Sequence, residues 1–313
     1  MEWLSPTDFP AQQHDMITQR QEGTGQWFLD SLEFKRWLQG SLKTLFCPGI
    51  PGAGKTMMAA TAIDHLCRTA GSDDVGTAYL FCSYKTQADQ SVASLLAALL
   101  KQLVQSRPNI AAPVTNMYDH HSKRSSRPSL DEILQGLHSV CSNYAAVYII
   151  VDALDECADR DGGRGRLIDK LRELQARIDV QLLFTSRFIP EITQRFESNS
   201  VLEVRASEED VRRFVAGQVL RLPKCIQRDE ELKQAVQNKI VEAVDGMYVL
   251  STRFLCTNDS HNIARFLLAR LHIDSLLDKR NKQKVLSTLE KLSKGSAATH
   301  SKELPSIASG PSA

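Results

Sequence analysis

The sequence predicts an α/β fold with a mainly parallel, doubly wound sheet, followed by a small helical domain. Between about residues 41 and 205, short apolar runs alternate with helical periodicity, which is the pattern of strands joined by crossover helices. The run Ala146–Val151 is apolar throughout, as expected of a strand covered on both faces. After Ser207 no strand signal of comparable strength returns, so the second domain is expected to be helical.

The elements of the first domain follow in order along the chain. Residues 1–40 are interpreted as a linker or pre-NTPase segment, with one short amphipathic helix at Phe34, Trp37 and Leu38. Strands are predicted at Leu42–Cys47, Gly76–Tyr84, Ala146–Val151, Val180–Thr185 and Val201–Val204. Helices are predicted at Lys55–Arg68, Ser91–Gln105, Leu130–Cys141 and 166–177. Ser129 and Glu132 form a capping box before the third helix, and Ile110–Arg127 is predicted to be a polar loop.

The predicted helical domain spans residues 206–293. Its helices are expected at 208–221, 229–244, 266–278 and 281–293, and Ser207 is placed to cap the first of them. Residues 294–313 are rich in Ser, Ala and Pro, which predicts a disordered tail.

Composition excludes several classes of function. The 313 residues carry 38 Lys and Arg against 37 Asp and Glu, so no global basic field indicates a specific nucleic-acid partner. The longest apolar run, Ala145–Val151, is far shorter than the roughly 20 residues of a membrane span, and the N-terminus has no signal-peptide pattern. The seven cysteines form no C-x-x-C pair, which favours reduced thiols over a zinc site or disulfides. These observations predict a cytoplasmic protein.

The strongest motif is Gly49-Ile50-Pro51-Gly52-Ala53-Gly54-Lys55-Thr56, a match to G-x-x-x-x-G-K-[ST] between a predicted strand and a predicted helix. Such a loop wraps its N–H groups around nucleotide phosphates at a helix N-terminus. Lys55 is expected to neutralise the β- and γ-phosphates, and Thr56 to offer an oxygen to Mg²⁺. The motif predicts a P-loop that binds ATP or GTP together with Mg²⁺.

A second motif is the apolar strand that ends at Asp152 and is followed by Ala153, Asp155 and Glu156. An acid at the strand tip can hold Mg²⁺ beside Thr56, and a carboxylate a few residues further on can activate the attacking water. Asp152 is therefore the predicted metal ligand, and Glu156 or Asp155 the predicted catalytic base.

A third strand ends in Thr185-Ser186-Arg187. Because the tips of parallel strands collect at the ligand edge of a sheet, Arg187 could approach the γ-phosphate and sense its presence. A surface arginine at a strand end is the alternative interpretation.

At these three motifs the sequence resembles the NACHT-type NTPases of the signal-transduction STAND class, particularly fungal NLR-like proteins whose module is also described as nephrocystin-like. The stretch Arg20–Leu29 resembles the segment that precedes the P-loop there, and the likeness covers about residues 3–247 and 267–293. The resemblance implies a signalling switch in an innate-recognition or incompatibility receptor, driven by ATP or GTP exchange, reset by slow hydrolysis and forming a homo-oligomer on activation. It also favours the sensor role of Arg187.

Two alternatives to the switch stay open. One is a constitutive P-loop ATPase or nucleotide kinase, which fast steady-state turnover would reveal. The other is a non-cycling interaction remnant of a larger repeat protein, which nucleotide stoichiometry would reveal. Members of the resembled family usually carry an effector domain before the NTPase and ankyrin, propeller or TPR-like repeats after it, and neither is expected within these 313 residues.

The segment Tyr248–Phe266 departs from the family pattern. Asp245-Gly246-Met247 resembles a helical-domain signature that runs directly into an apolar helix in relatives, whereas here the segment intervenes before Leu267. Because it lacks amphipathic order and its codons can supply splice signals, we interpret it as a retained in-frame intron; an ordinary loop insertion is the alternative.

Asp119-His120-His121 is a weaker candidate for metal binding. No second ligand cluster accompanies it in the sequence, so a solvated loop is the preferred interpretation.

Overall fold

The computed structural model describes residues 2–69, 74–123, 126–254 and 265–298. The chain divides into two compact units. Unit 1 comprises Met1–Arg20, Gly25–Ile50 and Gly54–Arg205, and unit 2 comprises Gln21–Thr24, Pro51–Ala53 and Ala206–Ala313.

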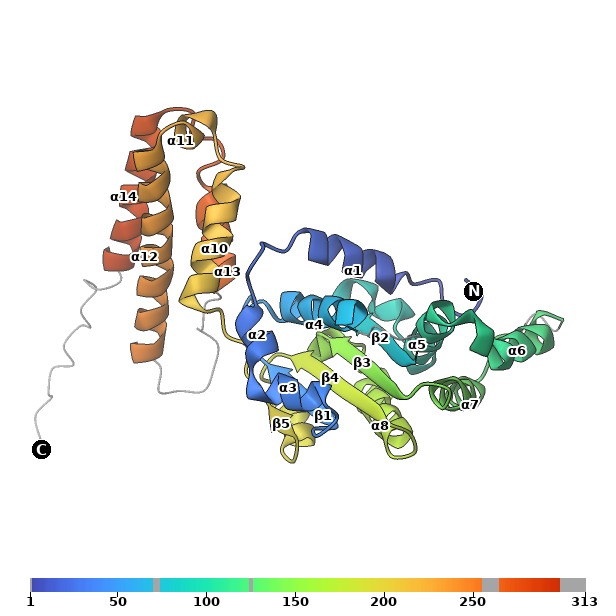
Figure 1. Ribbon diagram of the computed structural model, residues 1–313. Coiled ribbons are helices and arrows are strands. Elements are labelled where there is room, and N and C mark those ends of the chain that lie inside the picture. Colours follow the sequence, from blue (N-terminus) through green and yellow to red (C-terminus); the bar gives the residue numbers. More distant parts are fainter. Residues whose placement is uncertain (1, 70–73, 124–125, 255–264, 299–313) are drawn as a thin grey trace, which may run out of the picture. The chain divides into compact units, whose positions relative to one another are not determined.

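Unit 1 is built on a five-stranded sheet with the order β2-β3-β4-β1-β5 (Figure 1). Its strands are β1 (Thr44–Pro48), β2 (Val75–Phe81), β3 (Ala146–Asp152), β4 (Val180–Ser186) and β5 (Ser200–Val201). Every pairing is parallel, and the register sets Phe46 of β1 beside Phe184 of β4. The predicted α/β class with a parallel sheet is confirmed, and all strand tips lie at one edge.

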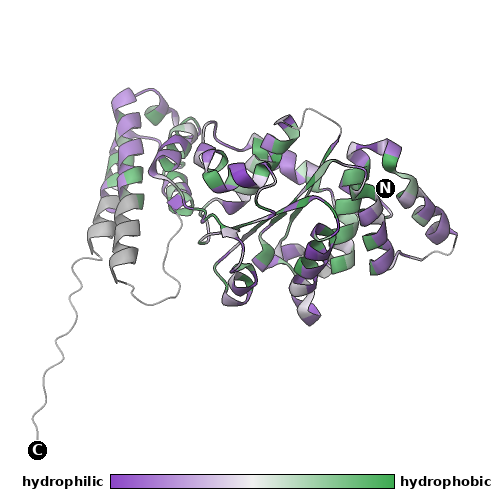
Figure 2. Ribbon diagram, turned by 60° about the horizontal axis from the view of Figure 1, so that its bottom comes forward, coloured by the Kyte–Doolittle hydropathy of each residue, from purple (hydrophilic) through white to green (hydrophobic). Residues whose placement is uncertain are grey.

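Helices cover both faces of the sheet, as its continuous apolar strands require. On one face, Phe9 of α1 (Phe9–Thr18) lies against Phe81 of β2, with ring centroids 6.4 Å apart, and α1 packs on α4 (Lys55–Thr69). On the other face, a Cβ at Gly76 would lie 2.9 Å from Leu103 of α5 (Val92–Ser106). Helices α7 (Leu130–Cys141) and α8 (Gly163–Gln175) pack beside α5. Hydrophobic residues are concentrated along the strands between these layers (Figure 2).

Most of the N-terminal segment, Met1–Arg20 and residues 25–40, is part of unit 1, whereas the sequence predicted a linker or pre-NTPase segment over residues 1–40. Besides α1 it forms α2 (Gln26–Asp30) and α3 (Leu32–Leu38), where Phe28, Phe34 and Trp37 are fully buried. Trp37 also donates from Nε1 to the carbonyl oxygen of Leu182 in β4, at 2.9 Å. The composition of the segment is polar overall and did not indicate these aromatic contacts, because only a few widely spaced side chains make them.

The stretch 110–127, predicted to be a polar loop, contains a helix. After η2 (Pro108–Ile110), α6 spans Ala112–Ser122 and buries Val114, Met117 and His121. These positions are three and four residues apart, so they share one helical face that the intervening polar residues mask in the sequence. The capping box before α7 is confirmed, since Ser129 Oγ accepts from Glu132 N–H and Glu132 Oε2 accepts from Ser129 N–H.

The segments after the strands form short turns. β2 ends at Phe81, three residues before the predicted end at Tyr84, because the chain turns there into η1 (Tyr84–Asp89). The remaining short elements of unit 1 are η3 (Leu154–Glu156), η4 (Arg160–Gly162), α9 (Pro190–Thr193) and η5 (Gln194–Phe196).

Unit 2 contains the helices α10 (Glu208–Val219), α11 (Lys224–Gln227), α12 (Glu230–Phe254), α13 (Arg265–Asp274) and α14 (Lys282–Ala298). Its core is aliphatic and includes Val215, Ile240 and Leu276, all fully buried. Helix α12 continues past the predicted end at residue 244 and enters the segment 248–266. Residues 255–264 of that segment lie outside the described residues, so its origin as a retained intron stays a prediction. Of the predicted tail 294–313, residues 299–313 also lie outside the described residues, and α14 includes 294–298.

Two further expectations can be compared with the described residues. Among them, no helix combines the length and apolarity needed to cross a membrane. Their six cysteines are unpaired thiols, of which Cys47, Cys82, Cys141 and Cys157 are buried and Cys67 is exposed.

Candidate nucleotide-binding site

The P-loop connects β1 to α4 at the edge where the strands end. Gly49 donates its N–H to the carbonyl oxygen of Ser186 at 3.0 Å, and a Cβ at Gly49 would lie 2.6 Å from the carbonyl oxygen of Val204. Only glycine lets the Val204 carbonyl oxygen lie this close to the backbone at position 49. Gly54, with φ of 94°, occupies the left-handed region that favours glycine and ends the loop where α4 begins.

Lys55 is the first residue of α4, and its side chain turns back over the loop. Its Nζ donates to the carbonyl oxygens of Gly49 at 2.8 Å and Ile50 at 2.9 Å. Burial lowers the pKa of Lys55, and the charges of Asp155 and Asp152 oppose that shift. The ammonium group therefore lies at the helix N-terminus and close enough to the strand-tip acids to be affected by their charge.

Asp152 ends β3 and is 2% exposed. Its Oδ1 accepts a hydrogen bond of 2.6 Å from Thr185 Oγ1, and the Thr56 hydroxyl lies close enough to the carboxylate to lower its pKa. Burial raises the pKa of Asp152, while the two hydroxyl groups and the charge of Lys55 act in the opposite direction. The structure thus brings together Thr56 and Asp152, the two residues that the sequence predicted as Mg²⁺ ligands. A hydroxyl and a carboxylate are hard oxygen donors, which fits Mg²⁺.

Ala153 turns the chain sharply after β3. Its φ of 53° and ψ of 48° are left-handed, an uncommon conformation for a residue with a side chain. The turn is held by its N–H, which donates to Thr185 Oγ1 at 2.9 Å. The same hydroxyl therefore fixes both the metal-ligand candidate and the turn that leads to Asp155 and Glu156.

Asp155 and Arg187 form a tightly held pair. Arg187 donates from its backbone N–H to Oδ1 at 2.9 Å and from Nε to Oδ2 at 2.5 Å. Burial alone would raise the pKa of Asp155, but the hydrogen bonds from Arg187 outweigh it and hold the pKa below its usual value. The Asp155 side chain is 2% exposed and that of Arg187 is 49% exposed, so the buried acid anchors an arginine that still reaches solvent.

Glu156 is half-buried and faces the turn after β2. Its Oε2 accepts from Tyr84 N–H at 3.3 Å, and its carbonyl oxygen accepts from Gln87 Nε2 at 3.0 Å. Sequence reasoning missed Tyr84 and Gln87, because nothing local to them indicates that β2 lies beside β3. It included Thr185 in a polar strand tip without assigning it a role.

These features define a P-loop NTPase module: a nucleotide-binding loop after the first strand, with an acid and an arginine at the tips of the neighbouring strands. The family model Nephrocystin 3, N-terminal, matches residues 23–187, which is more than half of the chain. The chain belongs to this family, and the matched residues form a NACHT-like NTPase module.

Three examples illustrate the solved structures with similar folds. Domain III of the Thermotoga maritima replication initiation protein DnaA has 14% identity and a TM-score of 0.41, over 83% of this chain and 96% of that one. The Aeropyrum pernix ORC1 protein in complex with DNA has 15% identity and a TM-score of 0.45, over 87% and 66%. A Walker-type ATPase of Pyrococcus abyssi has 12% identity and a TM-score of 0.46, over 86% and 72%. A search of the curated proteins finds no match to this sequence.

Proposed function

We propose that this protein is a STAND-type signalling switch, which binds ATP or GTP with Mg²⁺, hydrolyses it slowly and changes conformation between the triphosphate- and diphosphate-bound states. The observation that carries the proposal is the Asp155–Arg187 pair at the nucleotide edge. The Asp155 carboxylate accepts from the backbone N–H and Nε of Arg187. Within the described residues, Nη1 and Nη2 of Arg187 have no hydrogen-bond partner. An arginine anchored in this way can contact a γ-phosphate and lose that contact after hydrolysis.

The other residues have separate proposed roles. The N–H groups of Gly49–Thr56 and the Lys55 ammonium bind the phosphates. Thr56 and Asp152 would hold Mg²⁺, which when bound neutralises charge on the β- and γ-phosphate oxygens. Glu156 accepts a proton from the attacking water, because it is the strand-tip carboxylate with the fewest competing partners. Asp155 is a positioning residue that acts through Arg187.

The family resemblance supports the wider setting of this proposal. In that setting the module is part of an NLR-like receptor in the cytoplasm and forms homo-oligomers when activated. The match to the nephrocystin 3 N-terminal family is consistent with this role.

Nucleotide binding is tested by calorimetry with ATP and GTP. Lys55→Ala should weaken triphosphate binding by about 2–5 kcal/mol, the cost of removing one partner of a desolvated charge pair, and should leave the circular dichroism spectrum unchanged. Equal binding by the parent and Lys55→Ala would refute the P-loop assignment. A parent protein that binds neither nucleotide would favour the non-cycling remnant.

Hydrolysis is tested with Glu156→Gln and, as a control, Glu191→Gln at an exposed position of α9. Loss of a general base should slow hydrolysis by about 10²–10⁴-fold with binding retained, while Glu191→Gln should hydrolyse like the parent. Equal rates for the parent and Glu156→Gln would exclude the proposed base. A steady-state rate of about 1–100 s⁻¹ would favour a constitutive enzyme or kinase.

The sensor role is tested with Arg187→Ala and Asp155→Asn. Both variants should bind diphosphate like the parent and lose the preference for triphosphate. Hydrogen exchange of the parent should differ between its diphosphate complex and its complex with a non-hydrolysable triphosphate, and Arg187→Ala should reduce that difference. Identical exchange in the two parent complexes would refute the switch.

A further inference from the structure

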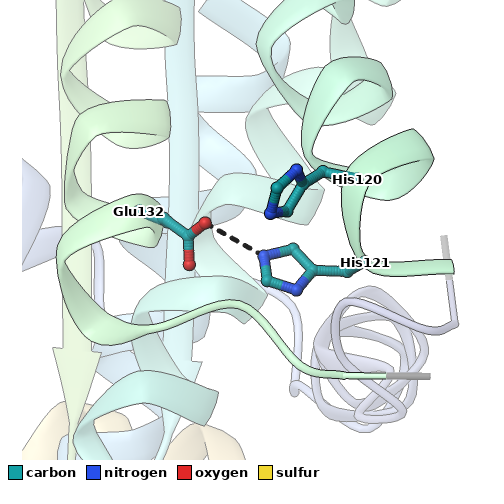
Figure 3. Close-up of side chains that lie close together, drawn as sticks. All are labelled: His120, His121 and Glu132. Atoms are coloured by element: carbon teal, nitrogen blue, oxygen red, sulfur yellow. Dashed lines mark hydrogen bonds and ion pairs between the residues drawn. The ribbon is translucent and has the colours of Figure 1, made fainter. Parts of the chain in front are cut away.

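A cluster of three metal-ligand side chains lies outside the nucleotide site, where α6 ends and α7 begins (Figure 3). His120 and His121 belong to the last turn of α6, and Glu132 to the first turn of α7. One ligand atom from each residue can be chosen so that all three lie within 4.8 Å of one another. The closest two, His121 Nε2 and Glu132 Oε1, are 3.0 Å apart.

Neighbouring hydroxyl groups orient two of the three ligands. His121 is 7% exposed, and its Nδ1 lies 2.8 Å from Ser126 Oγ, so its ring is fixed with Nε2 toward Glu132. Glu132 Oε2 accepts from the N–H and Oγ–H of Ser129, both at 2.8 Å, which leaves Oε1 facing His121. Hydrogen bonds of this kind on the far side of a ligand fix its orientation in protein metal sites.

The donor set selects a class of metal. Two imidazole nitrogens and one carboxylate oxygen suit Zn²⁺ and the neighbouring divalent transition metals, whereas Mg²⁺ and Ca²⁺ prefer oxygen ligands throughout. With zinc–ligand bonds of about 2.0–2.1 Å, tetrahedral ligand atoms lie about 3.3 Å apart. The pair of His121 and Glu132 is already near that separation, and the exposed His120 offers a ligand atom within 4.8 Å of both.

We propose that His120, His121 and Glu132 form a zinc site that links the end of α6 to the start of α7, with water or a partner's side chain as the fourth ligand. Three protein ligands leave one tetrahedral position open. The site is separate from the P-loop, so its metal has no part in nucleotide hydrolysis. This interpretation differs from the solvated loop predicted from the sequence, because α7 supplies the second ligand source that the sequence pattern did not show.

The test uses the full chain without an affinity tag, treated with a chelator and dialysed against micromolar Zn²⁺ in the absence of nucleotide. Metal analysis should give one zinc per chain. His120→Ala, His121→Ala and Glu132→Gln should each weaken zinc binding by at least about tenfold. Replacement of the metal by Co²⁺ should give the intense visible absorption of a tetrahedral site, which each variant should lose.

Three features of the design keep the outcome clear. His14→Ala, at an exposed histidine of α1, and Cys67→Ser, at the exposed thiol, should both bind zinc like the parent. Because His121 is buried and its removal could disturb folding, the exposed His120 gives the decisive variant. An ordinary ion pair between His121 and Glu132 predicts no zinc binding at micromolar concentration, and that result would overturn the proposal. Binding that survives His120→Ala unchanged would overturn it as well.

Discussion

The Thr185 hydroxyl offers the sharpest test of how the site is held together. It is 1% exposed, donates to Asp152 Oδ1 at 2.6 Å and accepts from Ala153 N–H at 2.9 Å. Thr185→Val keeps the shape of the side chain and removes both hydrogen bonds. The variant therefore separates the hydrogen bonds from the packing of β4.

The expected loss of stability follows from the two hydrogen-bond partners of Thr185, which are Asp152 and Ala153. A hydrogen bond to a charged group contributes about 1.5–3 kcal/mol, and an N–H left without a partner costs about 1–3 kcal/mol where it is buried. Ala153 is only partly buried, so we take the lower part of the second range. Thr185→Val should then destabilise the protein by about 3 kcal/mol. Thr185→Ser keeps the hydroxyl and loses one methyl group, at a cost of about 1 kcal/mol.

Urea denaturation of the parent and both variants, followed by tryptophan fluorescence, measures the difference. Trp37 is fully buried in unit 1 and therefore reports on the unit that contains Thr185. Removal of the donor should also raise the pKa of Asp152 further and weaken the dependence of nucleotide binding on Mg²⁺. Equal destabilisation by Val and Ser would refute the reasoning, since packing and not hydrogen bonding would then account for the loss.

Substitutions at three other positions test separate parts of the fold. Ala153→Val places a β-branched side chain in the left-handed region and should destabilise the protein by at least about 1 kcal/mol in urea, whereas Ala153→Gly should stay within about 1 kcal/mol of the parent. Gly49→Ala should abolish nucleotide binding in calorimetry, because its Cβ would lie 2.6 Å from the Val204 carbonyl oxygen; wild-type affinity would contradict the observed loop geometry. Asp229 accepts from Lys282 Nζ at 2.6 Å and from Leu232 N–H at 3.0 Å, and these contacts, Lys282 first, lower its pKa. Their stabilising effect is present above about pH 4 and is lost as the pH falls through the lowered pKa. The melting temperatures of the parent and Asp229→Asn should therefore differ at pH 6 and approach each other on acidification, and a difference that stays the same from pH 6 to pH 3 would exclude the ion pair as its cause.

The sequence predicted the sheet well, because buried parallel strands carry a continuous apolar signal that needs no tertiary information. Ala146–Asp152 and Val180–Ser186 each differ by one residue at one end from the predicted strands. Helix α6 was missed because its buried face is narrow, with polar residues between Val114, Met117 and His121. The packing of the N-terminal segment was not predicted for a similar reason, since the burial of Trp37 depends on β4, which is distant in sequence.

The candidate site also contains features that local sequence predicted and features that it could not predict. The order of residues within the P-loop and the acid at the end of β3 are local signals, and the structure brings Thr56 close to Asp152. The contacts of Glu156 with Tyr84 and Gln87 require β2 to lie beside β3, and the pairing of Asp155 with Arg187 requires β4 to lie on the other side. Strand order is a property of the whole sheet, so no short motif could have predicted these contacts.

The same strand order separates the three acids after β3, which the sequence alone left partly interchangeable. Asp152 is enclosed, accepts from the Thr185 hydroxyl and lies near that of Thr56, so its position suits a metal ligand. Asp155 has both oxygens engaged by Arg187 and a lowered pKa, so it is a poor proton acceptor and a good anchor. Glu156 accepts from one backbone N–H through Oε2, and among the described residues Oε1 has no hydrogen-bond partner. Because a general base needs a lone pair that can reach water, the neighbours contributed by β2 and β4 favour Glu156 over Asp155 as the base.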